Sequence, residues 1–257
     1  MNDLLELLSS PLLDSERLDK LSWSSREAYA NAQPYPHIVI DDFLPPKVLR
    51  AVLDEFPGPE VAKKAWGNKD SSRDGYGHQA QFNKLSTRDE DKMGPVTVKL
   101  MQEMNSAQFI RFLQRLTRIP ALIPDPSYRG AGLHQTLAEG FLKVHVDFNT
   151  HHTTGLDRRC NCLIYLNEDW QEEWGGDLEI WNEDVTERVA LVPPIANRCV
   201  IFSTIPNSWH GHPRPLKCPE NTSRKSLVHF YYSNGRPEHE ISTSDSTTFW
   251  HDTPDGY

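Results

Sequence analysis

The sequence predicts a mainly β protein with helices (α+β), in which an antiparallel sandwich or jelly roll is supported by helices on one face. Two observations carry this prediction. Apolar residues recur at helical spacing in the first half of the chain, and from about residue 130 short alternating segments are separated by turns. The 257 residues can bury a sizeable core without help from disulfides.

The N-terminal half is expected to be mostly helical. Residues 1–33 carry leucines at helical spacing, and residues 36–57 predict a short strand, an Asp-rich turn and a helix that ends before Pro57. Residues 58–92 are polar and rich in Gly, Asp, Lys and Ser, which predicts a long loop. Another helix is predicted over residues 95–118.

Six strands at close spacing are predicted in the second half, because each segment alternates apolar and polar residues between turn signals. They are GFLKVHVDFN (140–149), RRCNCLIYLN (158–167), GGDLEIWN (175–182), ERVALVPP (187–194), NRCVIFST (197–204) and KSLVHFYYS (225–233).

The simplest organisation is one domain over residues 1–257. In it, residues 1–128 form a mostly helical support and lid, residues 129–240 the jelly-roll core, and residues 241–257 a C-terminal tail. A linker within residues 58–92 is the alternative.

Composition narrows the function classes. The formal net charge of -9 gives no basic surface for nucleic acid or for a membrane. No run of about 18 apolar residues is long enough to span a bilayer, and the acidic N-terminus does not resemble a signal peptide. The four cysteines form no CxxC pair, so we expect buried free thiols and a cytoplasmic protein.

A histidine and an aspartate interrupt the apolar strand FLKVHVDFN. Successive side chains of a strand point to opposite faces, so His145 and Asp147 share one face. Burying both side by side is costly unless something pairs with them. Either a metal ion or a plain hydrogen bond between the two would satisfy them.

A second histidine motif, WHGHP, follows a later strand. If the strands form a double-stranded barrel, His210 returns beside His145 and Asp147. Two histidines and one carboxylate leave metal positions open, as in non-haem Fe(II) oxygenases. His212 is the alternative ligand, and we prefer His210 because it directly follows the strand.

An anion-binding arginine is predicted in SRKSLVHFYYS. Arg224 begins this strand, and a buried arginine needs an anion, for which its forked donors suit a carboxylate. Lys225 is the alternative for this role. Tyr165 could donate its phenolic hydroxyl to the same carboxylate.

Together these motifs carry a family resemblance. HVD, YLNEDW, GGDLEIW, CVIFST, WHGHP and RKSLVHFYYS, in this order, resemble the catalytic core of the prolyl-4-hydroxylase-like Fe(II)/2-oxoglutarate dioxygenases. PYPHIVIDDFLPPKVLRAVLDEFP resembles the usual lead-in of that superfamily. The match covers roughly residues 35–57 and 130–236, and the ordered set is specific, whereas HxD alone is a weak signal.

The resemblance implies a double-stranded β-helix (cupin-like) core and a set of roles. His145, Asp147 and His210 would hold Fe(II). Arg224 would bind the distal carboxylate of 2-oxoglutarate, so it joins the catalytic set. The cofactor-binding residues would be Arg224, Tyr165 and Leu178. The reaction would use O2, with ascorbate as a reductant, and would release succinate and CO2 while hydroxylating a C–H bond.

The substrate is expected to be a peptidyl proline, an amino acid or another small molecule, with no nucleic acid or membrane as partner. The residues expected to contact it are His134, Gln135, Arg158, Asn161 and Trp209. Two other function classes stay open: a non-catalytic metal-binding cupin-like barrel, and a structural or interaction module with a polar core. A plain metal-binding barrel has no use for an arginine at this offset.

Overall fold

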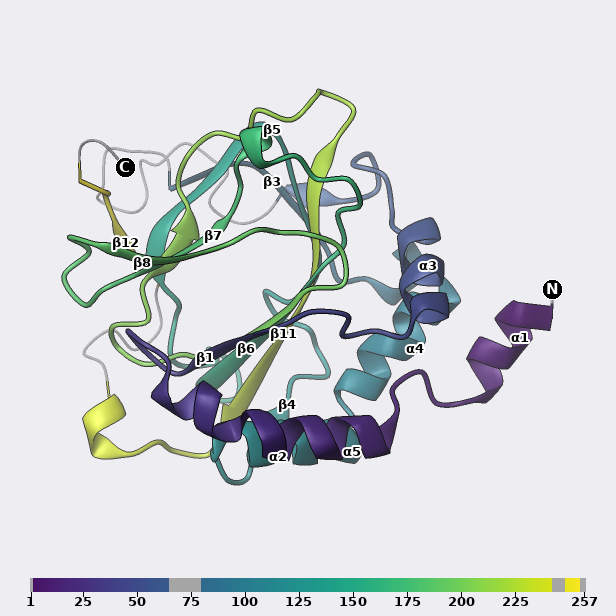
Figure 1. The fold of residues 1–257 in the computed structure, drawn as a ribbon, viewed down its shortest axis with the longest axis horizontal. Coiled ribbons are helices and arrows are strands. Elements are labelled where there is room, and N and C mark those ends of the chain that lie inside the picture. Colours follow the sequence, from purple (N-terminus) through teal and green to yellow (C-terminus); the bar gives the residue numbers. More distant parts are fainter. Residues whose placement is uncertain (1, 65–79, 242–247, 255–257) are drawn as a thin grey trace.

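In the described residues, a nearly closed antiparallel barrel with five α-helices forms the fold, which confirms the predicted α+β jelly roll with its helical support. The computed structural model describes residues 2–64, 80–241 and 248–254. Figure 1 shows the helices gathered on one side and along the lower end of the barrel. They are α1 (Asn2–Ser9), α2 (Ser15–Asn31), α3 (Pro46–Asp54), α4 (Pro95–Met104) and α5 (Ala107–Thr117).

The strands pair antiparallel in the order β1-β9-β6-β11-β5-β10-β7-β8. The shorter strand β4 pairs with β11, while β3 and β12 pair with β5, and β2 pairs with β3. The bounds are β1 (His37–Ile40), β2 (Lys63–Lys64), β3 (Gln81–Thr87), β4 (Ile123–Pro124), β5 (Gly132–Val146), β6 (Asp157–Tyr165), β7 (Leu178–Trp181), β8 (Arg188–Val192), β9 (Cys199–Ser203), β10 (His210–His212), β11 (Ser223–Ser233) and β12 (Phe249–His251).

Capping residues explain how the helices are divided. The Asp14 side chain accepts hydrogen bonds from the first backbone N–H groups of α2, so the predicted helical region 1–33 consists of two helices. The single helix predicted over residues 95–118 is wrong in one respect, because it breaks between α4 and α5. Ser106 there accepts a hydrogen bond from the Phe109 N–H and starts a new helix.

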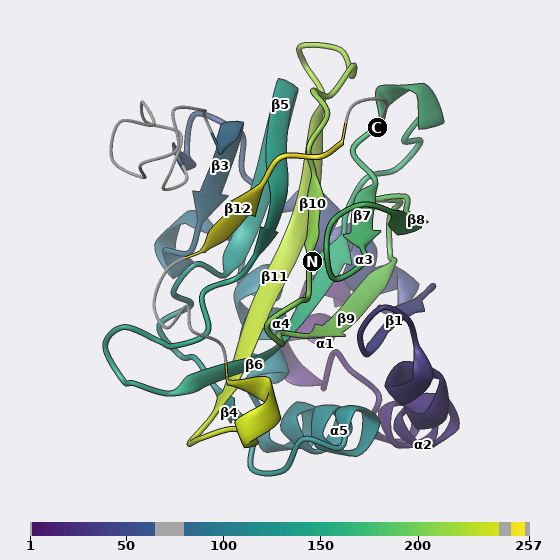
Figure 2. The same ribbon diagram turned by 90° about the vertical axis from the view of Figure 1, so that its left-hand side faces the viewer.

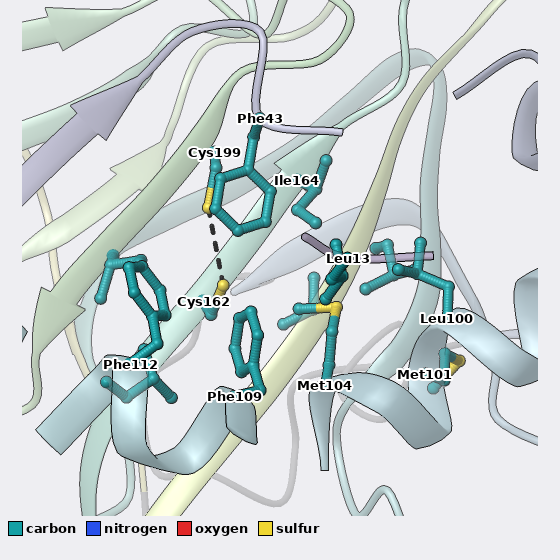
Figure 3. Packing of buried hydrophobic residues seen from close by; sticks show 14 of the residues in the cluster. Leu13, Phe43, Leu100, Met101, Met104, Phe109, Phe112, Cys162, Ile164 and Cys199 are labelled. Atoms are coloured by element: carbon teal, nitrogen blue, oxygen red, sulfur yellow. Dashed lines mark hydrogen bonds between the residues drawn. The ribbon is translucent and has the colours of Figure 1, made fainter. Parts of the chain in front are cut away.

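The main core lies between the helices and one face of the barrel. Figure 3 shows Phe109, Phe112 and Met104 from α4 and α5 packed against Cys162 and Cys199 from β6 and β9. The two thiols are 3.6 Å apart, and all four cysteines are free and buried, as expected. None of the helices in the described residues is long and apolar enough to cross a membrane.

The loop predicted over residues 58–92 contains a strand, so this part of the prediction is wrong. Strand β3 pairs with β5 from Gln81 to Thr87, with a register break around Asn83. The φ angle of Asn83 is 47°, and its side chain donates to the Ala138 carbonyl. This break hides the strand from sequence patterns, because alternation does not continue through it. Residues 65–79 of the predicted loop lie outside the described residues.

A bulge in β5 determines how the histidine side chains are oriented. His210 and His212 of β10 pair with His145 and Leu142, so one residue of β10, Gly211, faces two residues of β5. Because of the extra residue in β5, the side chains of Leu142 and His145 lie on the same face, and both line one cavity. Figure 2 shows β5 between β10 on one side and β3 and β12 on the other.

Gly211 is required opposite this bulge. A Cβ at Gly211 would lie 2.7 Å from the Lys143 carbonyl oxygen and 2.9 Å from that of Leu142. Gly211→Ala should therefore lower the free energy of unfolding by about 1–3 kcal/mol through overpacking, measured by urea denaturation.

Gly155→Ala is the matched control, because Gly155 has a φ of +70° but open space around its Cβ position. We expect the control to lose only about 1 kcal/mol from backbone strain. A loss in Gly211→Ala no larger than in the control would contradict the steric argument.

Candidate active site

Two histidines and one carboxylate converge at the end of β5. The ligand atoms of His145, Asp147 and His210 all lie within 4.8 Å of one another. Nε2 of His145 is 3.5 Å from Oδ1 of Asp147, and Nε2 of His210 is 3.5 Å from Oδ2. The bulge in β5 and the pairing of His145 with His210 across β5 and β10 create this arrangement.

The tautomers of both histidines fit a metal site. Nδ1 of His145 is 2.9 Å from the Lys143 carbonyl oxygen, and Nδ1 of His210 is 2.8 Å from that of Ser208. A carbonyl only accepts, so each Nδ1 carries the proton and each Nε2 presents a lone pair toward Asp147. Lone pairs facing a carboxylate at 3.5 Å repel it, and a cation between them removes that repulsion.

Burial keeps the imidazole of His210 neutral. Desolvation, and then His145 beside it, lower the pKa of His210 to about 3. Neutral imidazoles and an ionised carboxylate are the protonation states that bind a divalent metal. The three residues thus fit such an ion.

Asp147 is held ionised by its neighbours. Burial acts to raise its pKa, but the charge of Arg158, the largest opposing effect, helps to hold the pKa well below the usual range. Arg158 donates to Oδ2 of Asp147 at 3.0 Å, and Asn161 donates to the same oxygen at 2.7 Å. Arg158 is 1 % exposed, and its guanidinium lies over the rings of Phe148 and Phe230.

A second part of the site is formed by a buried arginine, Arg224. Arg224 donates to the Gly176 carbonyl at 2.6 Å and to the Tyr165 hydroxyl at 3.2 Å. Among the described residues, no carboxylate lies within salt-bridge distance of its guanidinium. Lys225, the alternative, instead extends its ammonium over the Phe56 ring at 5.3 Å.

The triad and Arg224 line one cavity of about 80 Å³. Of the other predicted residues, Tyr165, Leu178, His134, Arg158 and Asn161 also line it. His212 does too, although it is not part of the three-residue cluster.

Two predicted substrate residues lie elsewhere. The Gln135 side chain donates to the Pro57 carbonyl and accepts from Ser223, because it points away from the face that carries His134. The indole of Trp209 donates to the Glu183 carbonyl and does not line the cavity.

Lys84 is a cavity residue that the sequence did not reveal. It comes from β3, the strand hidden by the break at Asn83. Burial first, and then the charges of Arg224 and Arg158, lower the pKa of Lys84 to about 8 against the opposing effect of Asp147. The ammonium is therefore still mostly protonated at neutral pH.

Breaking the Asp147–Arg158 pair should destabilise the metal-free protein. Arg158→Met leaves a buried carboxylate without its cation, which should cost about 3–5 kcal/mol at pH 7. The lowered pKa of Asp147 stabilises the fold at pH values above its unfolded pKa. The penalty should therefore shrink as the pH falls and Asp147 can take up a proton.

Urea denaturation after dialysis against a chelator measures this effect. The double variant Asp147→Asn, Arg158→Met removes both charges and should lose less stability than Arg158→Met alone. Equal losses in the single and double variants would mean that the unpaired Asp147 carboxylate carries no penalty.

The comparison with known proteins matches the segment that contains these residues. Residues 131–232 match the model of the 2OG-Fe(II) oxygenase superfamily, and no curated protein matches the sequence. Among solved structures, a Pseudomonas putida prolyl-4-hydroxylase is similar with a TM-score of 0.53 and 16% identity, over 83% of this chain and 99% of that chain.

Two further structures have the same fold. A Phytophthora capsici prolyl 4-hydroxylase gives a TM-score of 0.53 and 21% identity, covering 87% of this chain and 67% of that chain. A Trichoplax adhaerens prolyl hydroxylase, in complex with a hypoxia inducible factor peptide fragment, gives a TM-score of 0.56 and 16% identity, covering 85% of this chain and 91% of that chain.

The matched segment contains the triad, Tyr165, Leu178 and Arg224. The superfamily takes its name from 2-oxoglutarate and Fe(II), which are accordingly the cofactors. Residues 131–232 thus match the 2OG-Fe(II) oxygenase superfamily, and the chain shares its fold with the prolyl 4-hydroxylase structures.

Proposed function

We propose that this protein is a dioxygenase that hydroxylates an unactivated C–H bond and converts 2-oxoglutarate to succinate and CO2. The observation that carries the proposal is the cavity itself. It holds an open two-histidine, one-carboxylate cluster and a buried arginine that pairs with no carboxylate among the described residues. This combination serves a metal and an anionic co-substrate together.

His145, Asp147 and His210 would hold Fe(II) in this proposal. The bound metal supplies the dioxygen chemistry that couples oxidation of 2-oxoglutarate to oxidation of the substrate. The chain contributes orientation: the Lys143 and Ser208 carbonyls fix the two imidazoles by accepting from Nδ1. Arg158 and Asn161 keep the Asp147 carboxylate charged and in place.

Arg224 would bind the distal carboxylate of 2-oxoglutarate. The Gly176 carbonyl accepts from its Nε, which sets the plane of the guanidinium, and Tyr165 lies beside it. Gly176 has a φ of +80°, and a Cβ there would lie 2.6 Å from the Leu216 side chain and 3.1 Å from Arg224. A glycine at this position thus lets the arginine reach the cavity.

The substrate classes that we propose are a peptidyl proline, an amino acid or another small molecule. The peptide bound to the Trichoplax adhaerens enzyme supports including a peptidyl substrate. O2 would be the second co-substrate, with ascorbate as a reductant. We also propose one domain over the whole chain and a cytoplasmic location, supported by one core that runs from Leu12 to Tyr232 and by four free cysteines.

Arg224 separates this function from that of a non-catalytic metal-binding barrel. Removing its charge should raise the Kd for 2-oxoglutarate by roughly 10–100-fold, since a charge-assisted hydrogen-bond pair contributes about 1.5–3 kcal/mol. Metal affinity should not change in Arg224→Met, because Arg224 contacts none of the three ligands. Anaerobic titration, followed by the visible absorbance of Fe(II) with 2-oxoglutarate, measures both quantities.

Lys225→Met is the matched control, because Lys225 neighbours Arg224 but extends over Phe56. The control should bind 2-oxoglutarate like the wild type. If the wild-type protein binds metal but no 2-oxoglutarate, the non-catalytic barrel is the correct function.

Turnover tests the choice of ligands. Succinate release from 2-oxoglutarate in air should disappear in Asp147→Ala and His210→Ala, because each removes one of three metal ligands. His212→Ala should retain most metal binding, since His212 lines the cavity outside the cluster. The reverse order of the two histidine variants would show that the ligand is His212.

A further inference from the structure

Another histidine of the cavity is buried without a hydrogen bond. His212 is 4 % exposed, and its Nδ1 atom is enclosed by protein with no hydrogen-bond partner among the described residues. It follows the metal-ligand candidate His210 by two residues on β10, and both side chains line the cavity. A polar ring in this position costs desolvation free energy unless a ligand pairs with it.

The hydrogen-bond partners of the imidazoles differ between His212 and the two candidate ligands. In His145 and His210, Nδ1 donates to a backbone carbonyl, which leaves the Nε2 lone pair for the metal. Nδ1 of His212 has no such acceptor. Buried N–H groups without an acceptor are rarer in proteins than buried acceptors without a donor, so the hydrogen of His212 belongs on Nε2. An imidazolium also carries a hydrogen there, so Nε2 is a donor in either protonation state.

Nε2 of His212 faces the cavity beside Arg224. Because Nδ1 is enclosed by protein atoms, the edge of the ring that lines the cavity carries Nε2. The cavity holds only about 80 Å³, and Arg224 and Tyr165 line it as well. Burial, and then the charge of Arg224, lower the pKa of His212 well below its usual range, so Arg224 is the charged group that acts on His212 most strongly. An anion bound by Arg224 in this small cavity therefore lies within reach of His212.

A buried histidine without a partner does not indicate a ligand by itself. His229 of β11 is 1 % exposed, and its Nε2 also lacks a hydrogen-bond partner among the described residues. Its ring packs against the rings of Tyr128 and Tyr231, however, and it does not line the cavity. The position in the cavity is what gives the free donor of His212 a ligand to bind.

We propose that His212 donates a hydrogen bond through Nε2 to the distal carboxylate of 2-oxoglutarate, beside Arg224 and Tyr165. This inference rests on the proposed function, in which Arg224 binds that carboxylate. An ionised carboxylate has about four acceptor positions, so it can take a donor from each of the three residues. The tautomers then divide the work of the histidines: His145 and His210 present lone pairs to the metal, and His212 presents an N–H group to the co-substrate.

Calorimetry with Mn²⁺ in place of Fe(II) tests this contact without turnover. His212→Leu removes the donor at similar volume and should raise the Kd of 2-oxoglutarate roughly tenfold or more, because hydrogen bonds to charged groups are the strong ones. His212→Gln should restore most of the affinity, since its amide nitrogen reaches the position of Nε2. His212→Asn should not, because its shorter amide reaches only the position of Nδ1. The Kd of Mn²⁺ should stay the same in all three variants.

A second ligand, 2-oxopentanoate, locates the contact on the co-substrate. It keeps the 2-oxo acid and has a methyl group in place of the distal carboxylate. Wild type and His212→Leu should therefore bind it with the same Kd. A loss as large as that for 2-oxoglutarate would place the contact at the 2-oxo acid and overturn the assignment.

His229→Leu is the matched control, because it removes a buried histidine without a hydrogen-bond partner that lies outside the cavity. It should bind both ligands like the wild type.

Two further results would overturn the inference. The first is an equal Kd of 2-oxoglutarate in wild type and His212→Leu. The second is an equal loss in the Leu, Gln and Asn variants, because the shape of the ring and not its donor would then matter. Either result leaves the proposed function intact, as long as the wild type binds Mn²⁺ and 2-oxoglutarate. A wild-type protein that binds the metal but no 2-oxoglutarate would overturn the proposed function and this inference together.

Discussion

The carboxylate of Asp147, buried inside the barrel, is the constraint on which the site depends. A carboxylate at 9 % exposure is costly unless it is paired and hydrogen-bonded, and both requirements are met from β6. Arg158 supplies the charge and Asn161 a second donor, while Phe148 and Phe230 enclose the guanidinium. These contacts reach Oδ2 of Asp147 from β6, while Nε2 of His145 on β5 lies 3.5 Å from Oδ1 and Nε2 of His210 on β10 lies 3.5 Å from Oδ2.

Much of this site could be predicted from the sequence because its chemistry is local to strands. His145 and Asp147 interrupt the apolar residues of one strand. Arg224 begins another strand, and a buried arginine needs an anion. These residue types therefore stand out in the chain. Breaks in strand register made the other residues of the site unpredictable from the sequence. Lys84 follows the break at Asn83, and the bulge opposite Gly211 decides which face His145 occupies. Sequence periodicity assumes regular alternation, which a bulge interrupts.

The partners of predicted residues were harder to foresee than the residues themselves. Arg158 and Asn161 were expected to contact the substrate, yet both hydrogen-bond Asp147 across 11 and 14 positions of sequence. Gln135 shows the same limit, since only the pairing of β5 with its neighbours fixes that it faces Pro57 and Ser223. Spacing along one strand predicts a face, whereas the contact made on that face depends on tertiary structure.

The distribution of charge is what favours the proposed function over a barrel that only binds a metal. A metal alone would satisfy the lone pairs of the histidines and the charge of Asp147, and Arg158 already pairs with that carboxylate. Arg224 would then add positive charge beside a cation, which opposes metal binding. The position of Arg224 becomes favourable when an anionic ligand enters with the metal. Under the proposed function, the cavity would therefore hold a metal together with a dicarboxylate, and the metal is one part of that assembly.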